Sequence, residues 1–314
     1  MTGIVILNYN NVADTLNCVK SVYKYCDAKS FSICVVDNNS KAAVIAAVRK
    51  GLMELGSVTE LNVGDKAPES MPSLTYLINR RNAGYAQGNN CGLNYFKQYK
   101  DLDYYLILNS DVILTEDLIA PLTNYLAAHE DVGVASPLLY GRTGNIDYNC
   151  ARHEKSKYNI FMRTLLIGRI SKIPCLSKKS EKSLILLEHP EYLNKKEVDI
   201  ELPSGSCMMF KRDVFERIGF FDPVTFLYFE EDIIWAKLKA LHIRCVLLPQ
   251  LSCIHLGEAS IGSSYSKVKA KSYTESLLYY VEKYSNFPSW FINLIKLNSQ
   301  LLKIKYLLKP EHKH

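Results

Sequence analysis

Short apolar runs that end abruptly in polar residues recur along the first half of the chain. They end at Asn8, at Asp37 and at Asn109. Runs of four or five apolar residues bounded in this way predict buried strands. Between the first two runs, apolar residues recur at helical spacing, so this part of the chain predicts a strand, a covering helix and a parallel strand.

Further strands are predicted at residues 74–78, 132–137 and 243–248, and a loop rich in Gly, Pro and Ser at 56–73. Amphipathic helices follow several of these strands. Alternation of strands and helices is typical of an α/β fold. We therefore expect a mixed, mostly parallel central sheet flanked by helices.

The polar residues after the predicted strands are candidates for a ligand site. In an open α/β sheet, ligands bind beyond the carboxyl ends of the parallel strands. Asp111, in the stretch Asn109-Ser110-Asp111 that interrupts an apolar segment, is the first candidate. Asx side chains also cap turns by bonding their own backbone, and both interpretations remain open for this residue alone.

Three glycines spaced by four, Gly84, Gly88 and Gly92, come at the mouth of a predicted helix. Glycines let the backbone approach a ligand closely, and a helix start favours anions, so this stretch indicates a site for a sugar diphosphate. The GxGxxG fingerprint and the GxxxxGK[ST] loop are both absent. Their absence argues against a nicotinamide-dependent dehydrogenase and against an ATPase or kinase of the P-loop type.

A second group of candidates lies in the later part of the chain. Glu230, Glu231 and Asp232 begin a predicted helix, and His255 follows the last predicted strand. A divalent cation that holds a diphosphate prefers carboxylate oxygens, and manganese also accepts imidazole, so Asp111 and His255 are the predicted metal ligands. The acidic triplet is then free to serve as a general base. Its alternative role is stabilisation of a helix N-terminus.

Composition supports a compact globular enzyme of 314 residues, with 48% hydrophobic and 22% charged residues. Nine cysteines without CxxC pairs suggest buried thiols in a reducing compartment. The chain starts directly on a predicted strand and contains no apolar stretch of membrane-spanning length, so we expect a cytoplasmic protein.

The net charge of +6 divides into −3 for the first 150 residues and +9 for the rest. A phosphate-bearing substrate or the anionic inner face of the plasma membrane fits this basic half. No helix-turn-helix, RNP-like motif or finger spacing accompanies the charge, so nucleic acid is not the expected partner.

Two segments depart from the strand and helix pattern. Residues 141–197 are basic and irregular, and we interpret them as an insertion or lid. The tail carries a heptad-like seam with Phe287, Trp290, Leu294 and Leu297 among lysines. Three interpretations of this tail remain open: a helix packed on the catalytic domain, a peripheral membrane helix, and the seam of a homodimer.

Seven motifs, in order, resemble the family 2 glycosyltransferases with a GT-A fold, particularly their bacterial rhamnosyltransferase-like branch. The resemblance covers roughly residues 2–285, and its motifs are IVILNYN, VVDNNS, NRRNAGYAQGNNCGL, LILNSDV, GSCMMFKRDVFERIGFFD, FLYFEEDIIWAKL and IHLGEAS. The resemblance implies a GT-A catalytic domain at 1–262. Its parts are a nucleotide-binding half at 1–140, the variable insertion at 141–197 and an acceptor-side half at 198–262. A C-terminal helical extension follows at 263–314.

The resemblance also implies roles for the candidate residues. Glu231 matches the usual catalytic base, with Glu230 and Asp232 as the other candidates, and Asp111 and His255 match residues at the metal. Asn109 stands where the family's DxD motif has its first acid. The residues expected to contact the nucleotide-sugar are Asn8, Asn10, Asp37, Asn82, Gly84, Asn89 and Ser110.

The implied activity is an inverting transfer of a hexose or deoxyhexose, dependent on Mn²⁺ or Mg²⁺. The donor would be a UDP- or dTDP-sugar and the acceptor an oligosaccharide or lipid-linked glycan of a bacterial surface polysaccharide. Two alternatives are a sugar-nucleotide pyrophosphorylase and a catalytically weak relative that only binds a glycan or nucleotide. A pyrophosphorylase would need a Gly-rich loop containing Arg after the first strand, where this chain has NYNNVADT.

Overall fold

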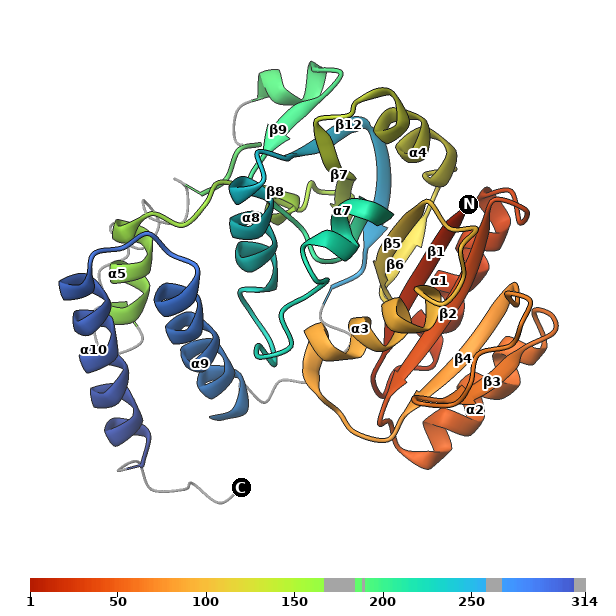
Figure 1. Cartoon of the computed structure of the whole chain (residues 1–314), viewed down its shortest axis with the longest axis horizontal. Helices are drawn as coiled ribbons and strands as arrows, with labels where there is room; N and C mark the ends of the chain where they lie inside the picture. The colour runs from red at the N-terminus through yellow and green to blue at the C-terminus, as the bar shows by residue number, and fades with distance from the viewer. Residues whose placement is uncertain (167–183, 188–189, 258–266, 308–314) are drawn as a thin grey trace.

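A computed structural model describes residues 1–166, 184–187, 190–257 and 267–307 (Figure 1). The rest of the predicted insertion (167–183 and 188–189), residues 258–260 of the last motif and the end of the tail (308–314) lie outside the described residues. Within the described part, no helix has the length and apolar character needed to cross a membrane.

The strands are β1 (Thr2–Asn8), β2 (Phe31–Asn38), β3 (Thr59–Asn62), β4 (Leu74–Asn79), β5 (Tyr104–Asn109), β6 (Val112–Leu114), β7 (Val132–Gly141), β8 (Ala151–Arg152), β9 (Val198–Ile200), β10 (Leu202–Pro203), β11 (Cys207–Lys211) and β12 (Arg244–His255). The helices are α1 (Ala13–Tyr25), α2 (Ala42–Met53), α3 (Gly84–Phe96), α4 (Ile119–Ala128), α5 (Lys157–Leu166), α7 (Arg212–Arg217), α8 (Glu230–Ala240), α9 (Lys267–Lys283) and α10 (Ser289–Leu307).

One large sheet organises the molecule, in the order β3-β4-β2-β1-β5-β11-β7-β12-β6, with β9 also paired to β12. The first five strands of this order run parallel, β11 pairs antiparallel with both its neighbours, and β7 pairs parallel with β12. The predicted mixed, mostly parallel α/β sheet is confirmed. The predicted loop at 56–73 is wrong in part, because β3 forms a short edge strand within it.

The glycine-rich stretch lies inside α3, where it lets the helix pack closely on the sheet. An added Cβ at Gly88 would lie 2.6 Å from Cδ1 of Leu7, and one at Gly92 would lie 2.7 Å from Cγ1 of Val5. These glycines therefore face β1 rather than a ligand. The prediction that they help to form a diphosphate site is wrong for Gly88 and Gly92.

A second hydrophobic core lies apart from the sheet and joins α5, α9 and α10 to the start of α8. Figure 1 shows these three helices grouped on the α8 side of the molecule. The buried members are Ile160, Phe229, Ile233, Leu277, Tyr280, Val281, Phe291 and Ile295. Part of the predicted irregular insertion is thus the helix α5, packed against the C-terminal helices.

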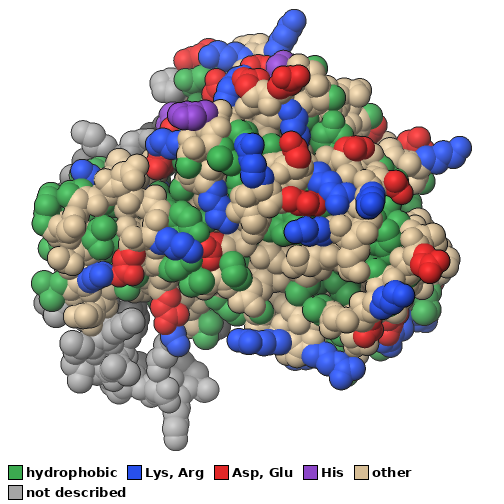
Figure 2. Space-filling model, in the orientation of Figure 1, with side chains coloured by type: hydrophobic (Ala, Val, Ile, Leu, Met, Phe, Trp, Pro, Cys, Tyr) green, Lys and Arg blue, Asp and Glu red, His purple; other side chains and the backbone are tan. Residues whose placement is uncertain are grey.

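The tail helix α10 packs back onto the protein, as one of the three interpretations expects. Its buried positions include Phe291 and Ile295, whereas Trp290 and Leu297 of the predicted seam are 67% and 55% exposed. These two positions of the seam are therefore not covered by the described part of the chain, and the membrane-helix and homodimer interpretations stay predictions. In Figure 2, Lys and Arg are scattered among acidic side chains on the viewed face rather than gathered in one patch.

Candidate active site

The polar ends of three neighbouring strands lie side by side at one edge of the sheet. The register places Asn8 of β1 opposite Asp37 of β2, and Leu7 of β1 opposite Asn109 of β5. Neighbouring strands are about 4.8 Å apart, so the ends of β2 and β5 are separated by roughly 10 Å. This span suits a nucleotide laid across the strand ends.

Asp37 and Asn8 form a fully buried pair below this edge. Oδ2 of Asp37 accepts hydrogen bonds from Nδ2 of Asn8 at 2.9 Å and from the Tyr76 hydroxyl at 3.2 Å, while Oδ1 accepts one from the Ser40 amide at 2.8 Å. Asn10 is exposed and has a φ of 55°. Its backbone amide donates a hydrogen bond to the hydroxyl of Ser40 and so joins the β1–α1 loop to the β2–α2 loop. Asp37 and Asn8 thus shape the edge from within, and only Asn10 reaches the surface.

The β4–α3 loop and the start of α3 hold the next three predicted donor residues: Asn82 lies in the loop, and Gly84 and Asn89 lie in the helix. Oδ1 of Asn82 accepts hydrogen bonds from the Gly84 amide at 3.0 Å and from the side chain of Asn38. Gly84 has a φ of +84°, and an added Cβ would collide with the carbonyl of Phe226. Asn89 is buried, and its Oδ1 has no hydrogen-bond partner among the described residues. Gly84 therefore has a packing role, and Asn89 keeps a free acceptor.

Asp111 and His255 come together although they are far apart in sequence. Strand β12 extends to His255, so this residue ends the strand instead of lying in the predicted loop after it. Its Nε2 lies 3.5 Å from Oδ2 of Asp111 and 3.2 Å from the hydroxyl of Ser206. Its Nδ1 lies 3.1 Å from Oδ2 of Asp147. Ser110, beside Asp111, is buried.

The two carboxylates determine the charge of His255. Burial lowers the pKa of His255, but its contacts with Asp111 and Asp147 outweigh burial and raise the pKa to about 9. Asp147 responds in the opposite sense, because its hydrogen bond with His255 lowers the pKa of the Asp147 carboxyl. The imidazole is therefore positively charged near neutral pH when only these side chains surround it.

The chemistry of the pair suits a divalent cation bound together with a diphosphate. Asp111 offers carboxylate oxygens and His255 offers Nε2. Asp147 contacts the other ring nitrogen of His255, Nδ1, and so can orient the imidazole. Among the described residues, no three His, Cys, Asp or Glu side chains gather so that they could hold a metal ion unaided. Two protein ligands suffice for Mg²⁺ or Mn²⁺ when phosphate oxygens and water complete the shell.

The three acids at the start of α8 occupy three different environments. Asp232 is 1% exposed and forms an ion pair with buried Lys155. Glu230 is 5% exposed, and its Oε1 has no hydrogen-bond partner in the part of the chain that the structure describes. The side chain of Glu231 is 21% exposed, and its Oε1 accepts a hydrogen bond from the Gly205 amide at 3.1 Å. Glu231 is thus the acid of this triplet that solvent reaches most readily.

Burial also separates the proton affinities within the triplet. It raises the pKa of Glu230 to about 8, and the negative charge of neighbouring Glu231 adds to the rise. A carboxyl with this pKa is largely protonated at neutral pH. Glu230 is therefore poorly suited to accept a further proton from a substrate.

The loop of residues 204–206 connects the two groups of candidates. The Gly205 amide binds Glu231, while the hydroxyl of the next residue, Ser206, contacts His255. The Ser206 carbonyl also accepts a hydrogen bond from the amide of Asn109, two residues before Asp111. This chain of contacts brings Glu231, His255 and Asp111 to one region, so they are not on opposite sides of the sheet.

Sequence reasoning missed three residues of this region. Asp147, Arg152 and Lys155 all come from the segment interpreted as an insertion, and they contact His255, Glu231 and Asp232 respectively. Nη2 of Arg152 lies 3.8 Å from Oε1 of Glu231. Their charges were visible in the sequence, but no local pattern connected them with partners about 80 to 110 residues away.

A cavity of about 610 Å³ opens elsewhere, along the outer face of α3. Its walls include Arg81, Asn94 and Lys97 together with residues of the loop before α8. None of Asp111, Glu231 and His255 lines it. The candidate metal ligands and the candidate base therefore lie outside this cavity.

Comparison of the sequence with known proteins identifies one family. The family model described as Glycosyl transferase family 2 matches residues 3–219. The low-salt glycan biosynthesis hexosyltransferase Agl10 of Haloferax volcanii is 30% identical over 168 residues, which are 52% of this chain and 45% of that protein. The chain therefore spans less than half the length of this curated relative.

Three solved structures share the fold at 12–14% identity. The structure of GalNAc-T7 with UDP, GalNAc and Mn²⁺ matches with a TM-score of 0.61. The matched region is 90% of this chain and 47% of the GalNAc-T7 chain. Mannosyltransferase PcManGT of Pyrobaculum calidifontis, with GDP-Man and Mn²⁺, matches with a TM-score of 0.53. The matched region is 99% of this chain and 76% of the PcManGT chain. Residues 1–349 of TarS from S. aureus match with a TM-score of 0.52, over 99% of this chain and 75% of the TarS chain.

Proposed function

Because the chain belongs to glycosyl transferase family 2 and has the GT-A fold of the similar structures, we propose that it transfers a sugar from a nucleoside diphosphate to a glycan or lipid-linked acceptor with inversion at the anomeric carbon. The observation that carries the proposal is the convergence of Glu231, His255 and Asp111 around the loop of residues 204–206. One sugar ring can bridge a base on one side and a leaving diphosphate on the other.

The nucleotide would lie across the ends of β2, β1 and β5. Asn10 offers an exposed side chain at this edge, and Asn89 offers an acceptor that has no partner within the described residues. Buried Asp37 acts from below by holding the amide of Ser40 and thereby the β2–α2 loop. Its direct contact with a base or ribose, expected from the family resemblance, stays a prediction.

Asp111 and His255 would hold the cation, and Mn²⁺ is the ion present with two of the similar structures. When bound, the cation would neutralise charge on the diphosphate leaving group. Asp147 would accept the Nδ1–H of His255, which leaves Nε2 free to face Asp111 and the cation. In the absence of a cation, the two carboxylates stabilise a proton on the same histidine.

Glu231 would accept the proton of the attacking acceptor hydroxyl. The Gly205 amide holds its Oε1, and Arg152 lies close enough to stabilise its charge. Asp232 is occupied by Lys155, and the raised pKa of Glu230 keeps that residue protonated, so neither competes well for this role. In-line attack with a general base produces inversion.

The donor would be a UDP-, dTDP- or GDP-linked hexose or deoxyhexose, and bacterial surface polysaccharide synthesis is the process we propose for it. The relative Agl10 is named for glycan biosynthesis, and the two liganded neighbours hold UDP and GDP-Man. A thermal-shift screen of nucleotide-sugars with Mn²⁺ would identify the donor, because a ligand bound only by the folded state raises its melting temperature.

Glu231→Gln tests the proposal. We expect this variant to lose transfer by at least about a thousandfold while its donor affinity stays within about twofold, because the amide cannot accept the proton but fills the same space. Glu230→Gln should retain transfer. Full turnover in Glu231→Gln together with loss in Glu230→Gln would move the base by one residue. Donor hydrolysis measured on the same proteins separates an enzyme from a binding-only relative.

A further inference from the structure

The segment that leads into α8 has a strained backbone. Tyr228 and Phe229, the two residues before Glu230, have φ values of 76° and 69°. Residues with a Cβ rarely adopt this left-handed conformation, and it persists only where the surrounding structure enforces it. Something in the fold must therefore hold this segment in place.

Helix α9 contacts the segment directly at its strained end. The buried hydroxyl of Ser276 donates a hydrogen bond to the carbonyl of Leu227 at 3.0 Å. The ring of Phe229 packs against Tyr280 and Tyr273 with centroid distances of 5.4 and 5.3 Å. Tyr273 also packs edge-on against Tyr228 at 5.5 Å. Both strained residues thus rest on α9.

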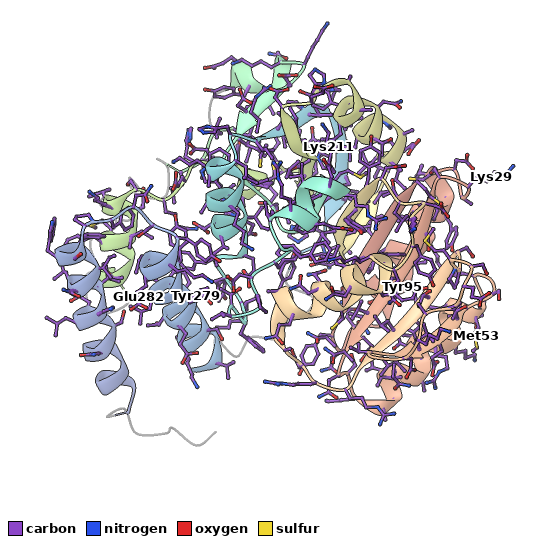
Figure 3. The ribbon with its side chains drawn as sticks, in the orientation of Figure 1. Lys29, Met53, Tyr95, Lys211, Tyr279 and Glu282 are labelled. Atoms are coloured by element: carbon purple, nitrogen blue, oxygen red, sulfur yellow. The ribbon has the colours of Figure 1, made fainter. Side chains whose placement is uncertain are left out.

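Helix α9 and the residue that follows it, Tyr284, hold the beginning of the segment. Asp222 is buried, and its Oδ2 accepts hydrogen bonds from the hydroxyls of Tyr279, at 2.9 Å, and Tyr284. Lys283 adds an ion pair at 3.3 Å. Figure 3 labels Tyr279 on α9, on the side of the molecule where α8 begins. Residues 222–229, which we name the α8 entry loop, are therefore held by α9 at both ends.

On its opposite side the α8 entry loop contacts α3 and the predicted donor residues. The carbonyl of Phe226 accepts a hydrogen bond from the amide of Tyr85 at 2.9 Å and lies against Gly84. The Tyr85 hydroxyl in turn donates to the carbonyl of Gly205, whose amide holds Glu231. A shift of the loop would therefore displace Glu231 in two ways. It would act through the backbone that leads into α8, and through the contacts of Tyr85 with Gly205.

From these contacts we infer that α9 positions the catalytic base: Ser276 and Tyr279, through the α8 entry loop, keep Glu231 at the place where it meets the acceptor hydroxyl. Both residues act through other groups and do not touch the substrate. The helix lies beyond residues 3–219 matched by the family model, so this function belongs to the C-terminal part of the chain. The inference rests on the proposed role of Glu231.

Ser276→Ala is the primary test, because it removes one hydroxyl and leaves the helix intact. Ser285→Ala is the matched control: its hydroxyl also donates to a backbone carbonyl, that of Val281, but it does not reach the loop. We expect Ser276→Ala to lower kcat at least fivefold with the donor KM within twofold, and Ser276→Thr to restore kcat. Tyr279→Phe should also lower kcat, whereas Ser285→Ala should leave both kcat and the donor KM unchanged.

Hydrogen exchange of the loop amides provides a readout independent of activity. Exchange at residues 227–231 should accelerate at least fivefold in Ser276→Ala and stay unchanged in Ser285→Ala. Unchanged exchange and kcat in Ser276→Ala would overturn the inference, as would equal losses in both variants that follow their melting temperatures. If exchange accelerates but Glu231→Gln is fully active, α9 still braces the loop, and it is the proposed base that fails.

Discussion

Glu230→Gln should stabilise the folded protein in alkaline solution and leave its stability unchanged in acid. The carboxyl of Glu230 is buried, and burial raises its pKa from the ordinary value of 4.5 to about 8. Between these two pH values the folded state keeps a proton that the unfolded state releases. Wild-type stability is therefore lost as pH rises from about 4.5 to about 8, whereas glutamine stays neutral throughout.

The size of the effect follows from the two pKa values. Each pH unit corresponds to about 1.36 kcal/mol, so ionisation of Glu230 lowers the free energy of unfolding by at most about 5 kcal/mol at pH 9. One kcal/mol moves the melting temperature of a domain this large by roughly 2 °C. Glu230→Gln should therefore melt up to about 10 °C above wild type at pH 9 and within about 2 °C of it at pH 5.

Thermal unfolding followed by circular dichroism at five pH values from 5 to 9 measures this difference. Glu275→Gln is the control, because it removes one negative charge from an exposed glutamate on α9. A difference between Glu230→Gln and wild type that is constant across pH, or that grows toward acid, would refute the account of Glu230 as a buried neutral carboxyl.

Substitutions at three further positions test the proposed metal site and the packing of α3. Asp111→Ala should weaken Mn²⁺ and donor binding together, each by at least about tenfold in calorimetry, and a fully active, chelator-insensitive variant would overturn its metal role. Asp147→Ala should weaken Mn²⁺ binding about tenfold and Asp147→Asn less, because the amide oxygen still accepts from Nδ1 of His255; equal affinities in all three proteins would contradict this. Gly92→Ala should destabilise the fold by about 1–3 kcal/mol in urea denaturation, because its Cβ would meet Val5, while Asn94→Ala on the exposed face of α3 should not; equal effects would count against close helix–sheet packing.

The parts of the site that the sequence predicted are those encoded locally. A buried strand that ends in Asx residues specifies both the strand and the edge where its polar end lies: Asn8 and Asn109 end β1 and β5, and Asp37 is the last residue but one of β2. The seven ordered motifs identified the family, which the family model confirms. Register then brings these strand ends together without further information from side chains.

The parts that escaped prediction depend on contacts between distant segments. Asp147 and Lys155 carry charges suited to many partners, and only the tertiary fold pairs them with His255 and Asp232. Gly92 illustrates the opposite error: glycines at the mouth of a predicted helix suggested a ligand site, but Gly92 lies inside α3, where the missing side chain makes room for Val5. The support of the α8 entry loop by Ser276 likewise has no local signature.

In the proposed site, Asp111, His255 and Glu231 would surround one sugar nucleotide and one cation. A crystal structure with Mn²⁺ and an unreactive donor analogue tests this arrangement. We expect anomalous density for manganese bonded to Asp111 and His255, with the anomeric carbon between the metal and the carboxylate of Glu231. Nucleotide bound in the cavity along α3, or manganese away from Asp111, would contradict the account.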